Sequence, residues 1–393
     1  MTPRYHVDEK LKEYATEVQK NMIDAVNEHR GFAPAAAALG LSPSTVRDAI
    51  YAAEKKAAIC GYAPEHDMRH VVPPPFVVKG VSTYYNKEGE VAGQWVKSKL
   101  DDSKALEVIK EFVEYLVQDA KGIAPLVSSP QNALADLLAV YPFGDPHFGM
   151  YAWAQECGDD FDLEAAERLT TGAVDSLVSS APPAATALLL LLGDVFHAND
   201  QTNQTPGHKH QLDVDSRYPK VILSGIKTFR HAILRAREKH EKVYVWIKPG
   251  NHDPQSIYAL IFALAAYFEN DPRVEIEINP SKFSFIRFGK VLIGSTHGDT
   301  VKHGQLPGLM AADRPEDWGQ TKHRYWYTGH VHHTSVSEFP GVVCESFRTL
   351  AAKDAYAAGH GYRAGRDMRV IVHHKDHGEV ARHRCDISMI EAA

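Results

Sequence analysis

Five apolar segments in the second half of the chain end in the same way, and this repetition constrains the fold most. The segments are LLAVYPF (137–143), TALLLLL (186–192), KVYVWIKP (242–249), KVLIGSTH (290–297) and RYWYTGH (324–330). The stretches between the first four of these segments have a helical pattern, which predicts helices near 162–180, 217–240 and 255–269. Nearly continuous apolar strands separated by helices are typical of a sheet covered on both faces. The sequence therefore predicts an α/β fold from about residue 134 onward.

Side chains of the types that can bind metals lie at the end of each segment or just after it. The stretches that follow are GDPHFG with Asp145 and His147, GDVFH with Asp194 and His197, GNHD with Asn251, His252 and Asp253, and the two last segment ends with His297, His330 and His332. One such stretch alone is as readily a turn or a helix cap. Five of them at strand ends indicate a site, because ligands bind outside the carboxyl ends of strands in such sheets.

The donor types narrow the chemistry of that site. Imidazole, carboxylate and amide donors without cysteine suit Mn, Fe or Zn better than a calcium cage. Seven ligands are too many for one ion and about right for two ions that share a carboxylate. Two ions roughly 4 Å apart can clamp a phosphoryl group and activate a water. The residues therefore predict a two-metal site for phosphate ester hydrolysis.

In their order, these motifs resemble the calcineurin-like metallophosphoesterase superfamily, whose pattern is D-x-H, G-D, G-N-H-[DE], H and G-H-x-H, over about residues 134–340. The resemblance implies a two-sheet β-sandwich flanked by helices. It assigns the first metal to Asp145, His147, Asp194 and His332, and the second to Asp194, Asn251, His297 and His330, so that Asp194 bridges. It makes His252 the histidine that protonates the leaving group or stabilises the transition state, and Asp253 the residue that orients it. The implied cofactors are two divalent ions, Mn first, with Fe, Zn, Mg or Ni as alternatives.

The run G-D-V-F-H is similar to the exonuclease branch that repairs DNA double-strand breaks, in which an added histidine, here His197, pairs with His252. Protein Ser/Thr phosphatases carry G-D-x-V-D-R-G instead. The long insert after His197 and the lack of a recognisable capping domain resemble phosphoesterases of bacteriophage genomes. We expect a phosphodiesterase for nucleic acid, DNA first. The alternatives are a small-molecule phosphodiesterase or phosphatase for cyclic nucleotides or nucleotides at the same site, a DNA-binding regulator, and an interaction module.

The polar loop over residues 196–217 is the part that the motifs explain least. Loops of this length within a domain are usually functional or disordered. His208, Lys209, His210 and Arg217 make it a candidate wall for a phosphate-bearing substrate, and a solvated surface loop is the alternative. The aromatic residues around Trp326, by contrast, are expected in the core rather than in a base-stacking platform.

The N-terminal segment, residues 1–62, predicts a small all-helical domain. Helices are expected over 18–29, 33–40 and 42–57, the last with Ser42 as N-cap and Pro43 at its first position, in a helix-turn-helix pattern. Such a domain would turn Ser44, Thr45, Arg47, Tyr51 and Lys55 toward nucleic acid. Residues 1–60 hold eight Lys or Arg and eight Asp or Glu, whereas DNA-binding modules tend to be basic. A protein partner or a homo-oligomer is therefore the alternative use of this domain.

Residues 63–133 are expected to form a linker with a hairpin around 86–89 and an amphipathic helix over 101–122, before a catalytic domain over 134–393.

Composition and charge limit the surface, the redox state of the cysteines and the location that we expect. The net charge of −7 argues against a broadly basic surface, and Cys60, Cys157, Cys344 and Cys385 are scattered as reduced thiols are. The charged N-terminal stretch is unlike a secretory signal, and the apolar run 184–192 is about half a membrane span. We expect a cytoplasmic protein without a membrane partner.

Overall fold

The computed structural model describes residues 6–64, 68, 71–72, 76–86, 91–100 and 122–391. The chain divides into two compact units, residues 1–108 and residues 109–393. The first unit contains the 3-10 helix η1 (Glu9–Tyr14), α1 (Glu17–His29), α2 (Phe32–Leu39), α3 (Pro43–Ile59), β1 (Phe76–Tyr85) and β2 (Val91–Leu100). The predicted helix over 101–122 lies outside the described residues, apart from its last position.

The three helices of the first unit form where the sequence places them. Thr16 begins α1 with a capping box, and the Ser42 hydroxyl accepts the N–H of Thr45 at 3.1 Å at the start of α3. Ile23, Val46 and Ile50 are fully buried in the core that these helices share. The helices are therefore confirmed, while their use as a DNA-binding helix-turn-helix domain stays a prediction. β1 and β2 pair antiparallel, as expected of the hairpin, and residues 87–90 between them lie outside the described part of the chain.

The second unit contains two larger sheets. Their strands are β3 (Leu134–Phe143), β4 (Ala184–Leu191), β5 (Lys242–Ile247), β6 (Val274–Ile276), β7 (Ser284–Phe288), β8 (Val291–Thr296), β9 (His323–Thr328), β10 (Ser335–Phe339), β11 (Val342–Ser346), β12 (Asp367–His374) and β13 (Gly378–Asp386). One sheet has the order β13-β12-β3-β4-β5-β6 and the other the order β10-β11-β9-β8-β7. Leu188 and Leu190 of the first sheet pack against Ile293 of the second, so the two sheets share a core. The expected mixed α/β fold is confirmed.

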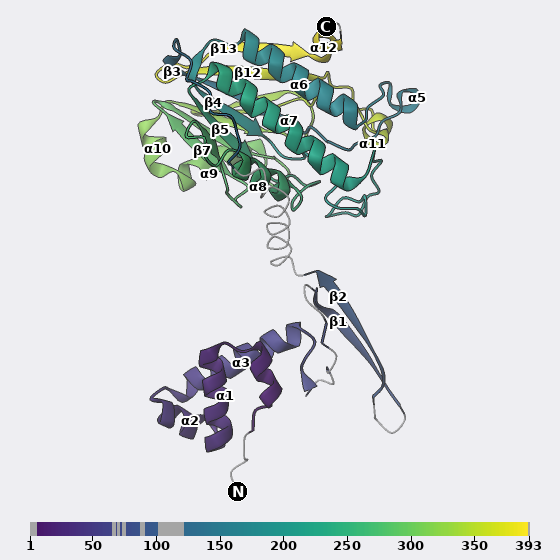
Figure 1. Ribbon diagram of the computed structural model, residues 1–393, viewed down its shortest axis with the longest axis vertical. Helices are drawn as coiled ribbons and strands as arrows, with labels where there is room; N and C mark the ends of the chain where they lie inside the picture. Colours follow the sequence, from purple (N-terminus) through teal and green to yellow (C-terminus); the bar gives the residue numbers. More distant parts are fainter. Residues whose placement is uncertain are drawn as a thin grey trace. The chain divides into compact units, whose positions relative to one another are not determined.

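Helices cover the other face of the six-stranded sheet. The helices of this unit are α5 (Ala154–Cys157), α6 (Leu163–Ser180), α7 (Tyr218–Lys239), α8 (Ile257–Tyr267), α9 (Leu306–Asp313), α10 (Pro315–Gln320), α11 (Ala355–Gly359) and α12 (Ile387–Glu391), with the 3-10 helix η4 (His303–Gln305). Figure 1 shows α6 and α7 side by side across this sheet. Leu189 and Leu191 of β4 point into the core beneath them, whereas Leu188 and Leu190 point to the second sheet. Two buried faces explain why the strand is apolar at every position except Thr186.

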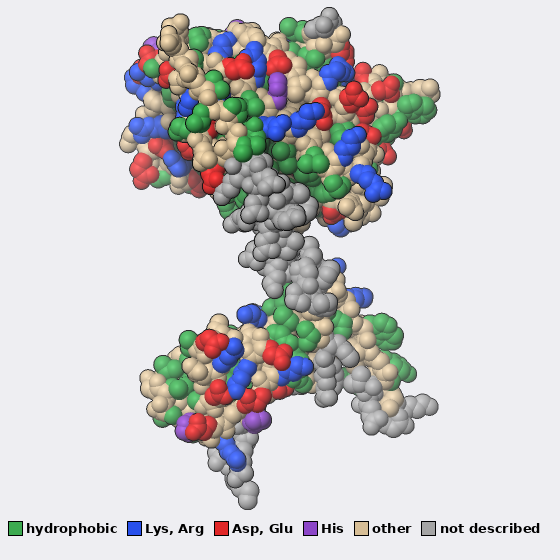
Figure 2. Space-filling model, viewed as in Figure 1, with side chains coloured by type: hydrophobic (Ala, Val, Ile, Leu, Met, Phe, Trp, Pro, Cys, Tyr) green, Lys and Arg blue, Asp and Glu red, His purple; other side chains and the backbone are tan. Residues whose placement is uncertain are grey.

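The core, the helices and the surface charges bear on three other expectations. Trp326 is fully buried beside Leu292 and Met310, which confirms its place in the core. No helix among the described residues has the length and apolar character that crossing a membrane requires. Figure 2 shows acidic and basic side chains interspersed on the face that it draws, so the described residues form no continuous basic surface there.

Candidate metal centre

The predicted ligands meet because their strands run parallel. β3, β4 and β5 are parallel neighbours in one sheet, and β8 and β9 are parallel neighbours in the other. Their carboxyl ends therefore lie at the same edge of the sandwich, and each candidate ligand follows one of these ends. Among the described residues, three groups have donor atoms that lie within 4.8 Å of one another inside the group: Asp145 with His147 and His332, Asp194 with His297 and His330, and His147 with His197 and His252.

The backbone at five of these residues is left-handed. Asp145, His147, Asp194, His330 and His332 have φ between 46° and 68°. Non-glycine residues rarely adopt this conformation, and it gathers at functional sites where the surroundings impose it. The sharp turns after the strands thus point the ligand side chains back toward one point.

The first group is built around two facing imidazoles. Nε2 of His147 and Nε2 of His332 lie 3.1 Å apart, and Nε2 of His332 lies 3.7 Å from Oδ1 of Asp145. The Asp145 carboxylate accepts the N–H of His330 at 2.9 Å and is fully buried. Three donor atoms therefore converge on one position, as a metal ligand set requires.

The second group is built around His297. Its Nδ1–H donates to the carbonyl oxygen of Leu192 at 2.8 Å, which directs Nε2 toward the site. Nε2 lies 3.2 Å from Oδ2 of Asp194 and 3.0 Å from Oδ1 of Asn251. All four residues assigned to the second metal by the resemblance, Asp194, Asn251, His297 and His330, therefore lie together.

Two glycines allow the loops to approach this closely. A Cβ on Gly250 would lie 2.0 Å from Oδ1 of Asp194, and one on Gly329 would lie 2.6 Å from Oδ2 of Asp145. Both carboxylates are thus packed directly against the backbone of a neighbouring ligand segment. The glycines of the G-N-H-D and G-H-V-H stretches are required by contact with the ligands, and not only by the turn.

Burial sets the protonation states of the donors. It lowers the pKa of His147 well below its usual value and that of His197 to about 3, so both rings are neutral at pH 7. It also raises the pKa of Asp145 to about 8. For His297 the effect of burial is outweighed by the charges of Asp194 and Asp145 and the hydrogen bond to Asp194, which raise its pKa to about 10. The proton on the His297 ring thus supplies positive charge between two buried carboxylates, and a cation bound at this position would replace that proton.

His197 and His252 lie beside the first group. Nδ1 of His197 is 3.3 Å from Nδ1 of His147, and the rings of His197 and His252 stack with centroids 5.3 Å apart. Nδ1 of His252 donates to the carbonyl oxygen of His197 at 2.7 Å. Nε2 of His197 is buried without a hydrogen-bond partner among the described residues. These contacts place the two histidines next to each other, as the resemblance implies.

Asp253 lies in a different place from the one expected. Its carboxylate accepts the N–H of Gly250 at 2.9 Å and the N–H of Phe196 at 3.1 Å. The expectation that Asp253 orients the His252 ring therefore needs correction, because the carbonyl oxygen of His197 holds that ring. Asp253 instead ties the loop after β4 to the loop after β5. Burial raises its pKa to about 7.

Thr349 and Asn199 also hold segments of the site in place, and neither residue was predicted from the sequence. The hydroxyl of Thr349 donates to the carbonyl oxygen of Asp145 at 2.6 Å. Oδ1 of Asn199 accepts the N–H groups of Gln255 and Ser256, at 2.9 and 3.1 Å. Asn199 thus joins the start of the 196–217 loop to the segment after G-N-H-D. An isolated Thr or Asn carries no sequence signal for such contacts.

The two donor groups open into a cavity of about 670 Å³. One wall consists of ligand residues and His252, and the other consists of residues 349–366, among them Lys353, Tyr356, Tyr362, Arg363 and Arg366. The described residues 197–217 do not line it. Instead, Val214 bridges to Met150 and Asp215 donates its N–H to Gly149. Where the sequence suggested the 196–217 loop as a wall, the structure places the glycine- and tyrosine-rich stretch YAAGHGYRAGR.

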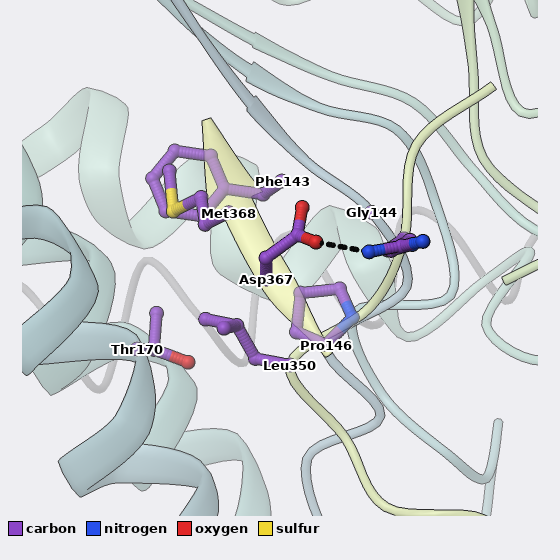
Figure 3. Close-up of a pocket in the computed structure, with 8 residues that line it drawn as sticks. Phe143, Gly144, Pro146, Thr170, Leu350, Asp367 and Met368 are labelled. Carbon is purple, nitrogen blue, oxygen red and sulfur yellow. Dashed lines mark hydrogen bonds and ion pairs between the residues drawn. The ribbon is translucent and has the colours of Figure 1, made fainter. Parts of the chain in front are cut away.

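A much smaller hollow of about 10 Å³ lies behind the end of β3 (Figure 3). It is lined by Gly144, Pro146 and Asp367 among others, and Arg348 donates to Asp367 at 2.6 Å. This hollow has room for about one water. The larger cavity is therefore the place for a substrate.

Neither a protein-family model nor a curated protein sequence matches the chain. Solved structures similar to it include a predicted phosphoesterase from Streptococcus pneumoniae TIGR4, with 10% identity, 65% of this chain and 99% of that chain covered, and a TM-score of 0.26. Vps29 complexed with zinc from Entamoeba histolytica has 15% identity over 64% of this chain and 99% of that chain, with a TM-score of 0.27. Vacuolar Protein Sorting 29 from Cryptosporidium parvum has 16% identity over 64% and 98%, with a TM-score of 0.29. Scores this low carry no argument about chemistry, which rests on the chain's own residues.

Proposed function

We propose that the chain is a two-metal phosphodiesterase that acts on nucleic acid, with DNA as the first candidate substrate. The observation that carries the proposal is the convergence of two donor groups, Asp145 with His147 and His332 and Asp194 with His297 and His330, on one open cavity. Asn251 completes the second group, and Asp194 is the proposed bridge. Two divalent cations held there would neutralise phosphate charge and activate a water.

His252 is the proposed catalytic histidine. It lines the cavity, and its Nδ1–H is held by the carbonyl oxygen of His197. A ring fixed in this way keeps Nε2 for exchange of a proton with the leaving oxygen. The stacked ring of His197 keeps His252 in place.

The walls of the cavity favour a nucleic acid over a small closed-in substrate. Lys353, Arg363 and Arg366 line it, and Asp354 is the acidic residue of the same wall. Since the 196–217 loop does not line the cavity, it does not close it over a small molecule. A phosphodiesterase for cyclic nucleotides remains the second candidate, because about 670 Å³ also suits a ligand of that size.

The first unit is the proposed means of localisation. Ser44, Thr45, Arg47, Tyr51 and Lys55 are exposed on α3, where the predicted contacts with nucleic acid lie. Binding of duplex DNA by the full chain should then weaken on substitution of Arg47. If DNA binding is unaffected, residues 1–62 serve a protein partner or a second copy of the chain instead.

The test is hydrolysis of bis-p-nitrophenyl phosphate, single-stranded DNA, duplex DNA and cyclic AMP by the purified protein. Manganese, zinc, iron, nickel and magnesium are each added after removal of bound metal. Asp194→Ala is assayed alongside, because a contaminating nuclease would survive that substitution. We expect metal-dependent hydrolysis of the diester and of DNA that Asp194→Ala abolishes. Activity that persists in Asp194→Ala, or none with any metal, would contradict the proposal.

A further inference from the structure

Two exposed tyrosines share the cavity with the metal ligands. Tyr356 is 59% exposed and Tyr362 is 57% exposed, and both line the cavity together with His252 and His330. Exposed tyrosines occur elsewhere on this chain, but these two lie on the wall of the cavity that the donor groups line, where a ligand can reach both rings. A tyrosine ring offers a flat face on which another planar ring can stack.

The rings are held in a row. His360 stacks on Tyr356 with ring centroids 4.0 Å apart and 29° between the ring planes. The centroids of His360 and Tyr362 are 6.3 Å apart, with 31° between their planes. Nδ1 of His360 donates to the carbonyl oxygen of Tyr356 at 2.8 Å, and the N–H of Tyr362 donates to Ala357 at 3.0 Å. The row is therefore ordered before any ligand arrives, which lowers the entropy cost of stacking.

A basic group lies beside this row. Lys353 and Arg366 lie 3.6 and 3.7 Å from the Asp159 carboxylate, so their charges are partly used within the protein. Arg363 is exposed, lines the cavity and donates to the carbonyl oxygens of Ala358 and Tyr362. Among the described residues it forms no ion pair with a carboxylate. Its charge is thus available to an anion in the cavity.

We propose that the faces of Tyr356 and Tyr362 not covered by His360 form a stacking wall for nucleobases next to the phosphodiester at the metal centre, and that Arg363 pairs with the neighbouring phosphate. The inference rests on the proposed function and names its substrate class. The recognised chemistry is a base attached to a phosphodiester, which both single-stranded nucleic acid and a cyclic nucleotide present. Only the polymer has a neighbouring phosphate for Arg363.

A binding experiment tests the wall without turnover. The full chain carrying Asp194→Ala is titrated with a single-stranded oligonucleotide that contains one 2-aminopurine, whose fluorescence is quenched by stacking, and calorimetry measures binding of cyclic AMP. Tyr356→Ala and Tyr362→Ala should each weaken binding about tenfold or more and reduce the quenching. Tyr356→Phe keeps the ring and should bind as well as the parent. Tyr151→Ala is the matched control, since Tyr151 is 45% exposed but lines a separate hollow with Trp153.

The outcomes separate the two sources and the two proposals. Weaker binding of either ligand in the Ala variants alone supports the wall, and the affected ligand is the source. Arg363→Gln should then weaken binding of the oligonucleotide but not binding of cyclic AMP. Unchanged binding of both ligands in both Ala variants overturns the inference. Turnover of the p-nitrophenyl ester of thymidine 5′-phosphate, compared with ethyl p-nitrophenyl phosphate, gives the second readout: equal losses on both esters also overturn it, because the tyrosines would then serve the centre itself. A wild-type protein that binds the base but hydrolyses neither ester fails only the proposed function.

Discussion

Gly250→Ala tests whether the close contact of backbone and carboxylate builds the metal centre. The added Cβ would lie 2.0 Å from Oδ1 and 2.3 Å from the backbone N of Asp194, whereas ordinary contact begins at 3.4 Å. The carboxylate oxygen therefore has to move by about 1.4 Å. It also accepts the N–H of His252 at 2.7 Å, so the displacement breaks that hydrogen bond.

The expected loss follows from the precision that metal ligands need. Ligand distances vary by only about 0.2 Å in functional sites, so a displacement above 1 Å removes Asp194 from the ligand set. Disturbing the orientation of a ligand alone costs about 10- to 100-fold in metal affinity, and we expect at least that loss here. Overpacking adds about 1–3 kcal/mol of destabilisation.

Calorimetric titration with Mn²⁺ measures the affinity, and elemental analysis of the dialysed protein measures the stoichiometry. Hydrolysis of bis-p-nitrophenyl phosphate should fall in parallel. Gly308→Ala is the matched control, because it lies in α9 and its Cβ would meet nothing within 4 Å. If Gly250→Ala binds Mn²⁺ with the affinity and stoichiometry of the wild type, the contact does not hold Asp194 in a ligand position and the reasoning is wrong.

Three other substitutions test separate parts of the structure. His252→Ala should keep the metals and lower kcat about 10²- to 10⁴-fold, as loss of a proton donor does; unchanged turnover at full metal content would refute its role. Asp253→Ala leaves the buried N–H groups of Gly250 and Phe196 without their acceptor, at a cost of about 1–3 kcal/mol each, so thermal denaturation should show a clear fall in Tm. Burial, aided by Lys239, lowers the pKa of His240 from 6.5 to about 4, although its bond to Ala184 opposes this. The neutral ring thus contributes up to about 3 kcal/mol that is complete above pH 6.5 and is lost as the pH falls through 4; urea unfolding between pH 7 and pH 4 should show a shallower loss for His240→Gln, and equal slopes would exclude this effect.

Much of the fold was predictable because its signals are local. β4 is apolar at each position except Thr186, since alternate leucines face two different cores, and this run is visible in the sequence. The candidate ligands follow strand ends, and the parallel pairing of β3, β4 and β5 then brings three of the segments to one edge. Their meeting with His297 and the G-H-V-H segment depends on the second sheet packing on the first, which the order of the motifs indicated.

The rest depends on contacts between segments that no local pattern encodes. The motif G-N-H-D places Asp253 next to His252 in the chain, which suggested that the carboxylate orients the ring. The N–H groups that donate to Asp253 belong instead to Gly250 and to Phe196 of another loop. The wall over 349–366 comes from a stretch without apolar periodicity, so nothing in it indicated the cavity. The 196–217 loop has the composition of a substrate loop, yet it packs along residues 149–151.

The left-handed backbone of the ligands shows how these contacts stabilise the site. Such conformations cost of order 1 kcal/mol each in residues other than glycine, so five of them in one site need compensation. The compensation comes from the neighbouring ligand segments: the carbonyl oxygen of Asp194 accepts the N–H of His147, and the Asp145 carboxylate accepts the N–H of His330. The strained turns at His147 and His330 are therefore each held by a hydrogen bond to another ligand segment. It follows that the segments form one cooperative unit, and that paired substitutions in two of them should weaken metal binding by less than the sum of the single effects.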